Sequence, residues 1–182
     1  MSDTNNIITL SRDVDAHLIP SGARIYLHKD TEVTITQALG SSYTVNIYGN
    51  LARIDGKDAD AIGREPTKAI PAELPEGTNL NDLVWHQLKT CYDPEIPVNI
   101  VDLGLIYNCE LIKKPGENEH RVDIKMTLTA AGCGMGPVLA SDVKQKLLAL
   151  PTVTEVNVEL VFDPPWDRSM MSEEAKLELG LL

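Results

Sequence analysis

The stretch that decides the fold is "RVDIKMTLTAAGCGMGPVLA", residues 121–140. Every second residue of its first part is apolar: Val122, Ile124, Met126 and Leu128. This period of two is typical of a strand that buries one face. A glycine-rich segment then leads to Pro137, and proline is favoured in the first turn of a helix, where its missing N–H needs no partner. We therefore predict a strand, a loop that contains Cys133, and a helix.

The segments before this stretch extend the pattern. Residues 79–92 carry a helical stripe that Asp93 ends, because a residue before proline disfavours helical backbone angles. Residues 101–114, "VDLGLIYNCELIKK", alternate like a strand and are followed by Pro115-Gly116, which is typical of a turn. The two strands are therefore predicted to form an antiparallel pair.

A further strand and a short helix complete this half of the chain. Apolar residues at helical spacing follow Pro137 and end at Pro151. The next strand is expected to point these side chains inward: Val156, Val158, Leu160 and Phe162. "DPPW", residues 163–166, is expected to be a rigid exit in which Trp166 covers an edge of the core, and Ser172 can cap a last helix. The order helix, strand, strand, helix, strand, helix predicts a two-layer α/β sandwich with a three-stranded mixed sheet.

The first half has a different character. Segments rich in β-branched and aromatic residues are separated by turn signals, and Gly49-Asn50 is expected at the centre of a type II′ hairpin turn. We predict a small antiparallel β domain of about five strands within residues 1–63. Residues 64–78, "REPTKAIPAELPEGT", hold three prolines and no periodicity, which is typical of an extended linker. The α/β domain is then expected to span residues 79–182.

Composition limits the partners and the compartment. The net charge of −11 argues against unassisted binding to nucleic acid or to an anionic membrane, whose phosphates would repel the chain. No apolar run approaches the ~20 residues of a membrane-spanning helix, and the N-terminus lacks the features of a signal peptide. Three cysteines are too few for a disulfide framework, which indicates a reducing compartment. We therefore expect a cytoplasmic protein.

The chemistry that the sequence offers centres on Cys133. A helix N-terminus carries partial positive charge that lowers the pKa of a nearby thiol, and the flanking glycines leave the sulfur uncovered. Such a thiol suits metal binding, although a tight turn that contains a small residue explains the same sequence equally well. Cys91 and Cys109 fall on apolar faces and are interpreted as structural. The sequence contains no C-x-x-C pair, P-loop or dinucleotide-binding glycine pattern.

A second unusual feature is the acidic loop that precedes the first strand of this half. Asp93 and Glu95 flank one proline, and Pro97 stiffens the loop further. Carboxylates held in this way can bind metal, act as general bases, or cap backbone N–H groups of the turn. The capping role is favoured, because Asp commonly forms a hydrogen-bonded turn ahead of proline.

Four separated motifs, taken in order, resemble a known family: "DPEIPVNIVDLGLIY", "MTLT" followed by "GC", "VNVELVFDPPW" and "MSEEAKLELG". They look like the metal-sulfur cluster biosynthesis domain shared by SufT and PaaD-like proteins, over residues 79–182. The first half resembles the additional N-terminal region of the longer SufT proteins, which narrows the resemblance to the SufT type.

The resemblance implies an accessory, non-enzymatic role in iron-sulfur protein maturation, in which clusters are delivered to recipient apo-proteins. It implies that Cys133 is a metal ligand and that Asp93, Glu95 and Thr129 complete the cofactor-binding residues. Many relatives place proline directly after this cysteine, where this chain has Gly134. The implied partners are iron-sulfur assembly proteins, the recipient apo-proteins and, in one arrangement, a second copy of the chain in a homodimer.

Ligand number limits how such a cluster could be held. A cluster usually takes about four thiolates, and one subunit offers one good candidate, Cys133. Further ligands would have to come from a symmetry mate, a partner or small thiols, so we expect a transient, labile cluster and none in the protein as purified. Two alternatives stay open: a scaffold whose acidic surface recruits assembly components, and, less favoured, a thiol-dependent enzyme, for which no base is evident.

Overall fold

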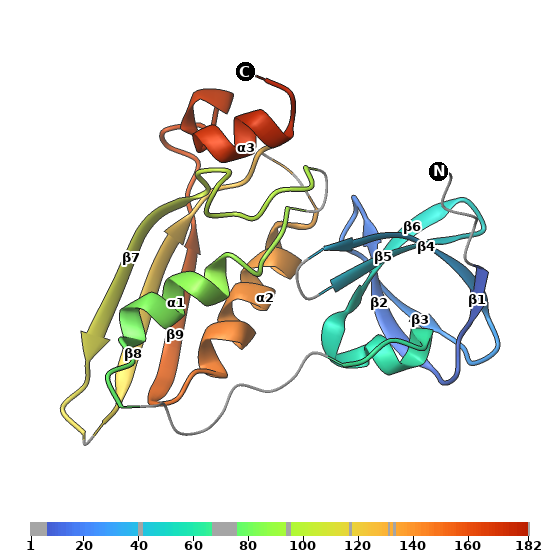
Figure 1. The fold of residues 1–182 in the computed structure, drawn as a ribbon, viewed down its shortest axis with the longest axis horizontal. Helices are drawn as coiled ribbons and strands as arrows, with labels where there is room; N and C mark the ends of the chain where they lie inside the picture. The colour runs from blue at the N-terminus through green and yellow to red at the C-terminus, as the bar shows by residue number, and fades with distance from the viewer. Residues whose placement is uncertain are drawn as a thin grey trace. The chain divides into compact units, whose positions relative to one another are not determined.

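The computed structural model describes residues 7–39, 42–66, 76–93, 96–116, 118–130, 132 and 134–181. The chain divides into two compact units, residues 1–68 and 69–182, whose elements are labelled in Figure 1. Residues 67–75, which make up most of the predicted linker, lie outside the described residues.

The first unit contains a six-stranded antiparallel sheet with the strand order β1-β4-β5-β6-β2-β3. Its strands are β1 (Ile7–Thr9), β2 (Val14–Ile19), β3 (Arg24–Leu27), β4 (Glu32–Leu39), β5 (Ser42–Ile47) and β6 (Asn50–Asp55). A 3₁₀ helix, Gly56–Ile62, follows and contributes buried alanine and isoleucine side chains to the core. The predicted small antiparallel β domain is confirmed. It has one strand more than expected, because β1 is only three residues long and too short to show a period.

The β5–β6 hairpin differs from its predicted turn by one residue. Ile47 pairs with Asn50, so Tyr48 and Gly49 are the central residues, with φ of 50° and 88°. Positive φ at both positions is the requirement of a type I′ turn, not of the predicted type II′ turn. The Asn46 side chain accepts a hydrogen bond of 2.9 Å from the Gly49 N–H, which stabilises this register.

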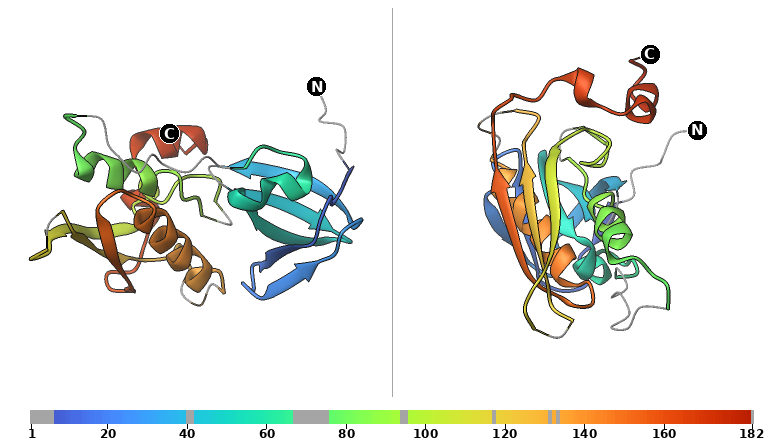
Figure 2. Two further views of the ribbon diagram at one scale, coloured as in Figure 1. Left: turned by 90° about the horizontal axis from the view of Figure 1, so that it is seen from below. Right: turned by 90° about the vertical axis from the view of Figure 1, so that its left-hand side faces the viewer.

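The second unit is the predicted α/β sandwich. Its elements are α1 (Leu80–Leu88), β7 (Ile106–Lys113), β8 (His120–Met126), α2 (Gly136–Leu148), β9 (Val153–Leu160) and α3 (Glu173–Glu178). Strand β8 lies in the centre, antiparallel to β7 and parallel to β9, so α2 is the crossover between parallel strands. Figure 2 shows α1 and α2 on the same face of this sheet.

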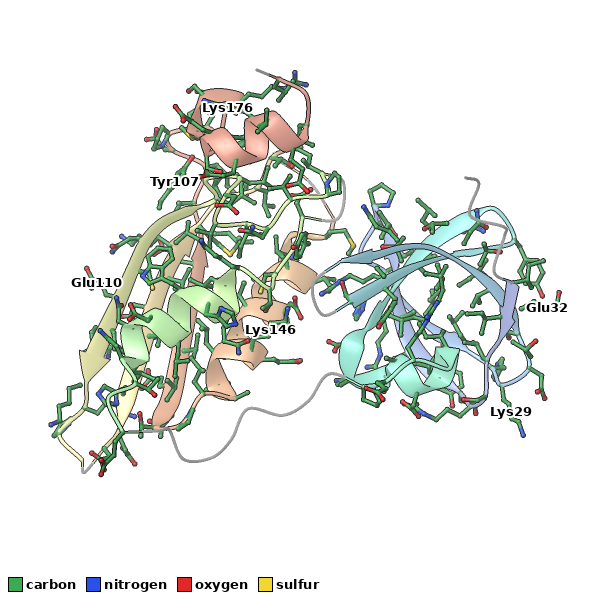
Figure 3. All side chains as sticks on the ribbon, viewed as in Figure 1. Lys29, Glu32, Tyr107, Glu110, Lys146 and Lys176 are labelled. Atoms are coloured by element: carbon green, nitrogen blue, oxygen red, sulfur yellow. The ribbon has the colours of Figure 1, made fainter. Side chains whose placement is uncertain are left out.

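The core of the second unit lies between that face and the two helices. The alternating residues of β8 point into it, as the period of two predicts, together with one stripe from each helix. Its most deeply buried members are Val84, Leu88, Ile100, Leu103, Leu105, Val122, Ile124, Met126, Val143, Leu147 and Val156. Lys146 of α2, labelled in Figure 3, donates a hydrogen bond of 2.9 Å to the Thr90 carbonyl and so ties α2 to the segment after α1.

Two predicted boundaries are wrong. Helix α1 ends at Leu88 and not near residue 92, and Cys91 enters the core from the turn that follows the helix. Phe162 is 47% exposed, because β9 ends at Leu160 and the alternation of the strand no longer applies beyond it. The predicted cap at Ser172 is confirmed, since its side chain accepts a hydrogen bond from the Ala175 N–H, and the Asn79 side chain caps α1 in the same way through the Asn81 N–H. Across the described ranges, no helix has both the length and the apolar character that a membrane crossing requires.

Candidate functional site

The structure describes two of the four predicted site residues. Asp93 and Thr129 are described, whereas Cys133 and Glu95 lie outside the described residues. The Thr129 hydroxyl donates to Asp93 Oδ2 over 3.4 Å. Asp93 in the acidic loop and Thr129 in the segment after β8 therefore lie side by side. Their roles in binding a cofactor stay predictions.

Asp93 is the anchor of its loop. Asp93 is buried, with 6% of its surface exposed. Oδ1 accepts a hydrogen bond of 2.9 Å from the Ile96 N–H, while its own N–H donates to the Val98 carbonyl over 3.2 Å. A buried carboxylate is tolerated only when donors satisfy it, and here a backbone N–H and a hydroxyl supply part of that compensation. The capping role favoured by the sequence is thus present in the structure.

Thr129 reaches Asp93 because strand β8 ends just before it. Beyond Met126 the chain leaves the sheet, and the Thr127 N–H donates to the Leu105 carbonyl over 2.9 Å. That bond fixes the strand end to the segment which follows the acidic loop. Thr127 itself is 1% exposed, and its hydroxyl has no hydrogen-bond partner within the described ranges. The burial of this hydroxyl was not predictable, since its position in the strand pattern is that of an outward-facing polar residue.

Helix α2 begins directly after the glycine-rich segment. Its N-cap is Met135, which makes no side-chain cap hydrogen bond, and the first turn contains Pro137 and no acidic residue. The start of such a helix carries partial positive charge and favours an anionic group. A Cβ at position 136 would lie 2.7 Å from Leu128 Cδ1, so a larger residue here would require the Leu128 side chain to shift. The helix start is therefore packed directly against the residues that follow β8.

The segment between the acidic loop and β7 forms a compact turn, residues 99–105, which we call the Asn99 turn. The Asn99 side chain accepts hydrogen bonds from the N–H groups of Val101 and Asp102, at 3.1 and 2.9 Å. It also donates to Asp102 Oδ2 over 2.6 Å. Asn, Asp and Gly close together are a turn signal, but the sequence prediction placed these residues at the beginning of a strand.

The two other cysteines are poor ligand candidates. Cys91 is 1% exposed and its thiol lies 3.7 Å from the Gln87 carbonyl. Cys109 packs against the core, and burial raises its pKa to about 11, which keeps the thiol protonated near neutral pH. Metal binding requires the thiolate, so both cysteines fit the predicted structural role. Within the described ranges, no three His, Cys, Asp or Glu side chains gather in a way that could hold a metal ion.

Comparison with known proteins places this unit in a family. The family model described as "Iron-sulfur cluster assembly protein" matches residues 81–159. The chain is 46% identical over 99 residues to an Fe-S protein maturation auxiliary factor of Porphyromonas gingivalis, covering 54% of this chain and 90% of that protein. It is 39% identical over 89 residues to the Fe-S protein maturation auxiliary factor SufT of Staphylococcus aureus, covering 49% of this chain and 96% of that protein.

A solved structure is also similar, that of a domain of unknown function, DUF59, from Bacillus anthracis. The identity is 37%, the match covers 57% of this chain and 93% of that chain, and the TM-score is 0.48. The family resemblance predicted from the four motifs is confirmed by the family model and by the two curated relatives. The chain belongs to the iron-sulfur cluster assembly protein family, and its relatives include SufT-type maturation factors.

Proposed function

We propose that this chain is an accessory factor in iron-sulfur protein maturation, which helps to deliver clusters to recipient apo-proteins and uses Cys133 as a transient ligand. Membership of the family supports the accessory role, since two relatives of which the chain covers nine-tenths or more are named Fe-S protein maturation auxiliary factors. The partners would be iron-sulfur assembly proteins and the recipients themselves.

The observation that carries the proposal is the contact between Thr129 and Asp93. It joins two sequence motifs that are 36 residues apart, and the second motif leads to the start of α2, whose N-cap residue makes no side-chain cap hydrogen bond. Cys133 lies between Thr129 and Gly136 in the sequence, within the short segment that connects these two features. A thiolate close to a helix N-terminus is stabilised by the helix dipole, which favours metal binding over the neutral thiol.

The hydrogen bonds of Asp93 support a non-catalytic role. Its two oxygens accept from the Ile96 N–H and the Thr129 hydroxyl, so the carboxylate is engaged in holding the loop in place. A general base needs a lone pair directed at the substrate proton, whereas these bonds direct the oxygens of Asp93 at its own loop and at Thr129. We therefore propose that the chain positions a cluster and its recipient without catalysing a reaction.

The cysteine inventory supports transfer rather than storage. With Cys91 buried and Cys109 protonated, the chain offers one thiolate, whereas a cluster usually takes about four. The remaining ligands would come from a second copy, a partner or small thiols. A cluster held in this way is readily released, which is the property that a delivery factor needs.

Anaerobic reconstitution with iron and sulfide, followed by absorbance, tests the proposal. The wild-type chain is expected to gain the visible absorbance of a cluster, Cys133→Ser to lose it, and the matched control Cys109→Ser to keep it. Equal absorbance in wild type and Cys133→Ser would contradict the ligand role. If the wild-type chain binds no cluster but still associates with assembly proteins, the scaffold alternative replaces the proposal.

A further inference from the structure

A segment far along the chain fastens the Asn99 turn from outside. Residues 163–172, which we call the C-terminal strap, run from beyond β9 to the start of α3. The Trp166 indole N–H donates to the Leu103 carbonyl over 2.7 Å, and the Ser172 N–H donates to the Asp102 carbonyl over 2.7 Å. Two carbonyls of the turn are thus satisfied by the strap.

Tyr107, directly after the turn, adds a third connection. Its hydroxyl donates to the Pro164 carbonyl over 2.7 Å. Figure 3 labels Tyr107 at the end of β7 that meets the segment leading to α3. The strap is therefore held at both ends and in the middle by residues 102–107.

The backbones of the two segments also meet directly. Gly104 has φ of 77°, and a Cβ at this position would overlap the Met170 carbonyl oxygen. Glycine is thus required both for the backbone angle and for the close approach.

The Asn99 turn in turn fixes the loop that carries Asp93. The Ile100 N–H donates to the Cys91 carbonyl over 2.9 Å, and Tyr92 and Asn99 form an isolated antiparallel bridge. Asp93 lies directly beyond this bridge and is bonded through its own N–H to the Val98 carbonyl. On the other side, the Leu105 carbonyl holds the strand end that leads to Thr129, through the Thr127 N–H.

We propose that the C-terminal strap is a positioning element of the site. Trp166 of the strap bonds to the Asn99 turn, and Tyr107 bonds to the strap, and together these bonds hold the turn so that Asp93 meets Thr129. The strap lies beyond residues 81–159, the part that the family model matches. The use of this site for clusters rests on the proposed function, whereas the positioning itself rests on the contacts. Loosening the strap then loosens the acidic loop more than it loosens the sheet.

Amide hydrogen exchange measured by NMR distinguishes positioning from general stabilisation. The variants are Trp166→Phe and Tyr107→Phe, each of which removes one donor and keeps an aromatic ring. Tyr26→Phe is the matched control, because it removes a tyrosine hydroxyl bonded to Asp13 in the first unit. The reporters are the N–H groups of Asp93 and Ile96, with the Leu139 N–H of α2 as the internal reference.

We expect exchange at Asp93 and Ile96 to be about fivefold faster in both strap variants, the effect of losing one hydrogen bond, with Leu139 unchanged. Tyr26→Phe should leave all three amides unchanged. Unchanged exchange at Asp93 and Ile96 would overturn the proposal. Equal acceleration at Leu139 would also overturn it, since the strap would then only stabilise the whole unit.

The same variants connect the strap to the proposed function. After anaerobic reconstitution with iron and sulfide, the half-life of the absorbance should fall several-fold in Trp166→Phe and Tyr107→Phe and remain that of the wild type in Tyr26→Phe. If the wild-type chain forms no cluster, the proposed function fails, and the exchange experiment still decides the positioning role. If the wild type forms a cluster whose half-life the variants leave unchanged, the strap does not act on the site.

Discussion

The second unit contains two contrasting kinds of polar group: exposed charged side chains on its sheet and a buried carboxylate in a loop. On the face away from α1 and α2, charged side chains line a depression of about 420 Å³ and pair with one another. Asp123 there contacts Arg121 at 3.1 Å and Asn157 at 3.0 Å, with each side chain reachable by water. Asp93, by contrast, is nearly buried and bonded by the backbone of its own loop.

The comparison shows which kind of polar group is expected to contribute more to the stability of the unit. Exposed ion pairs contribute little, because water and salt compete with them and long side chains lose freedom when they pair. A buried carboxylate that caps a turn contributes more, since removing it leaves N–H donors without a partner. We therefore expect the few polar residues bonded to backbone to stabilise the unit more than the many that form the charged face.

The largest expected loss of stability comes from placing a side chain on Gly104, where the Asn99 turn contacts the strap. Gly104→Ala should reduce the free energy of unfolding by about 3–4 kcal/mol, from the left-handed backbone plus the overlap with Met170. Gly180→Ala is the matched control, since Gly180 also has positive φ but open space around it, and should cost about 1–2 kcal/mol. Urea unfolding of both variants measures the difference. Equal losses would mean that the turn and the strap can separate at no cost.

The second prediction compares the buried Asp93 with the exposed Asp123. Asp93→Ala should reduce the free energy of unfolding by about 1–3 kcal/mol, because the partly buried Ile96 N–H loses its acceptor. Asp123→Ala, on the exposed face, should cost less than about 1 kcal/mol. Chemical denaturation under identical salt gives both values. A larger loss for Asp123 would reverse the ranking of the two faces.

A pair of threonines two residues apart gives a smaller and more specific test. Thr129→Val removes the hydroxyl bonded to Asp93 and should cost about 0.5–1.5 kcal/mol. Thr127→Val removes a buried hydroxyl for which the described residues supply no hydrogen-bond partner and keeps the shape of the side chain, so stability should stay equal or rise by up to about 1 kcal/mol. Thermal unfolding compares the two. Destabilisation by Thr127→Val would show that its hydroxyl is satisfied in solution.

The smallest effect is a dependence on pH. Burial raises the pKa of Cys109 to about 11, so the folded chain holds this proton more tightly than the unfolded chain does. The contribution to stability is therefore complete below the ordinary thiol pKa and is lost as the pH rises through about 11. Unfolding measured from pH 8 upward should show a steeper decline for the wild type than for Cys109→Ala. Parallel pH profiles would indicate that Cys109 is solvated.

Periodicity made most of the second unit predictable. The alternation in residues 121–129 and the apolar stripe of α2 arise because each element buries one face. The strands, the helix and the mixed sheet could therefore be predicted from these patterns. Phe162 breaks the rule because no local signal says where β9 stops. The turn at Tyr48 and Gly49 was missed by one residue, because either pair of neighbours contains the glycine that such turns need.

The site was predictable only in part, and for a different reason. Asp93 and Thr129 were found through motifs, and the cap formed by Asp93 through its place before proline. The contact between the Asn99 turn and Met170 joins segments more than sixty residues apart, and no periodic pattern in the sequence predicts such a contact. Trp166 was predicted to cover a core edge, and it packs there, but its hydrogen bond to Leu103 needed coordinates.

The distance along the chain between the strap and its turn has a consequence for synthesis. Trp166 follows Leu103 by 63 residues, and Pro164 follows Tyr107 by 57. At ~5–20 residues per second, a ribosome makes the acidic loop several seconds before the residues that secure it exist. Until then a nascent chain can fold its first unit, but the Asn99 turn, which fixes the loop of Asp93, lacks its bonds to Trp166 and Ser172. The order of translation itself thus keeps an unfinished chain from presenting a complete site.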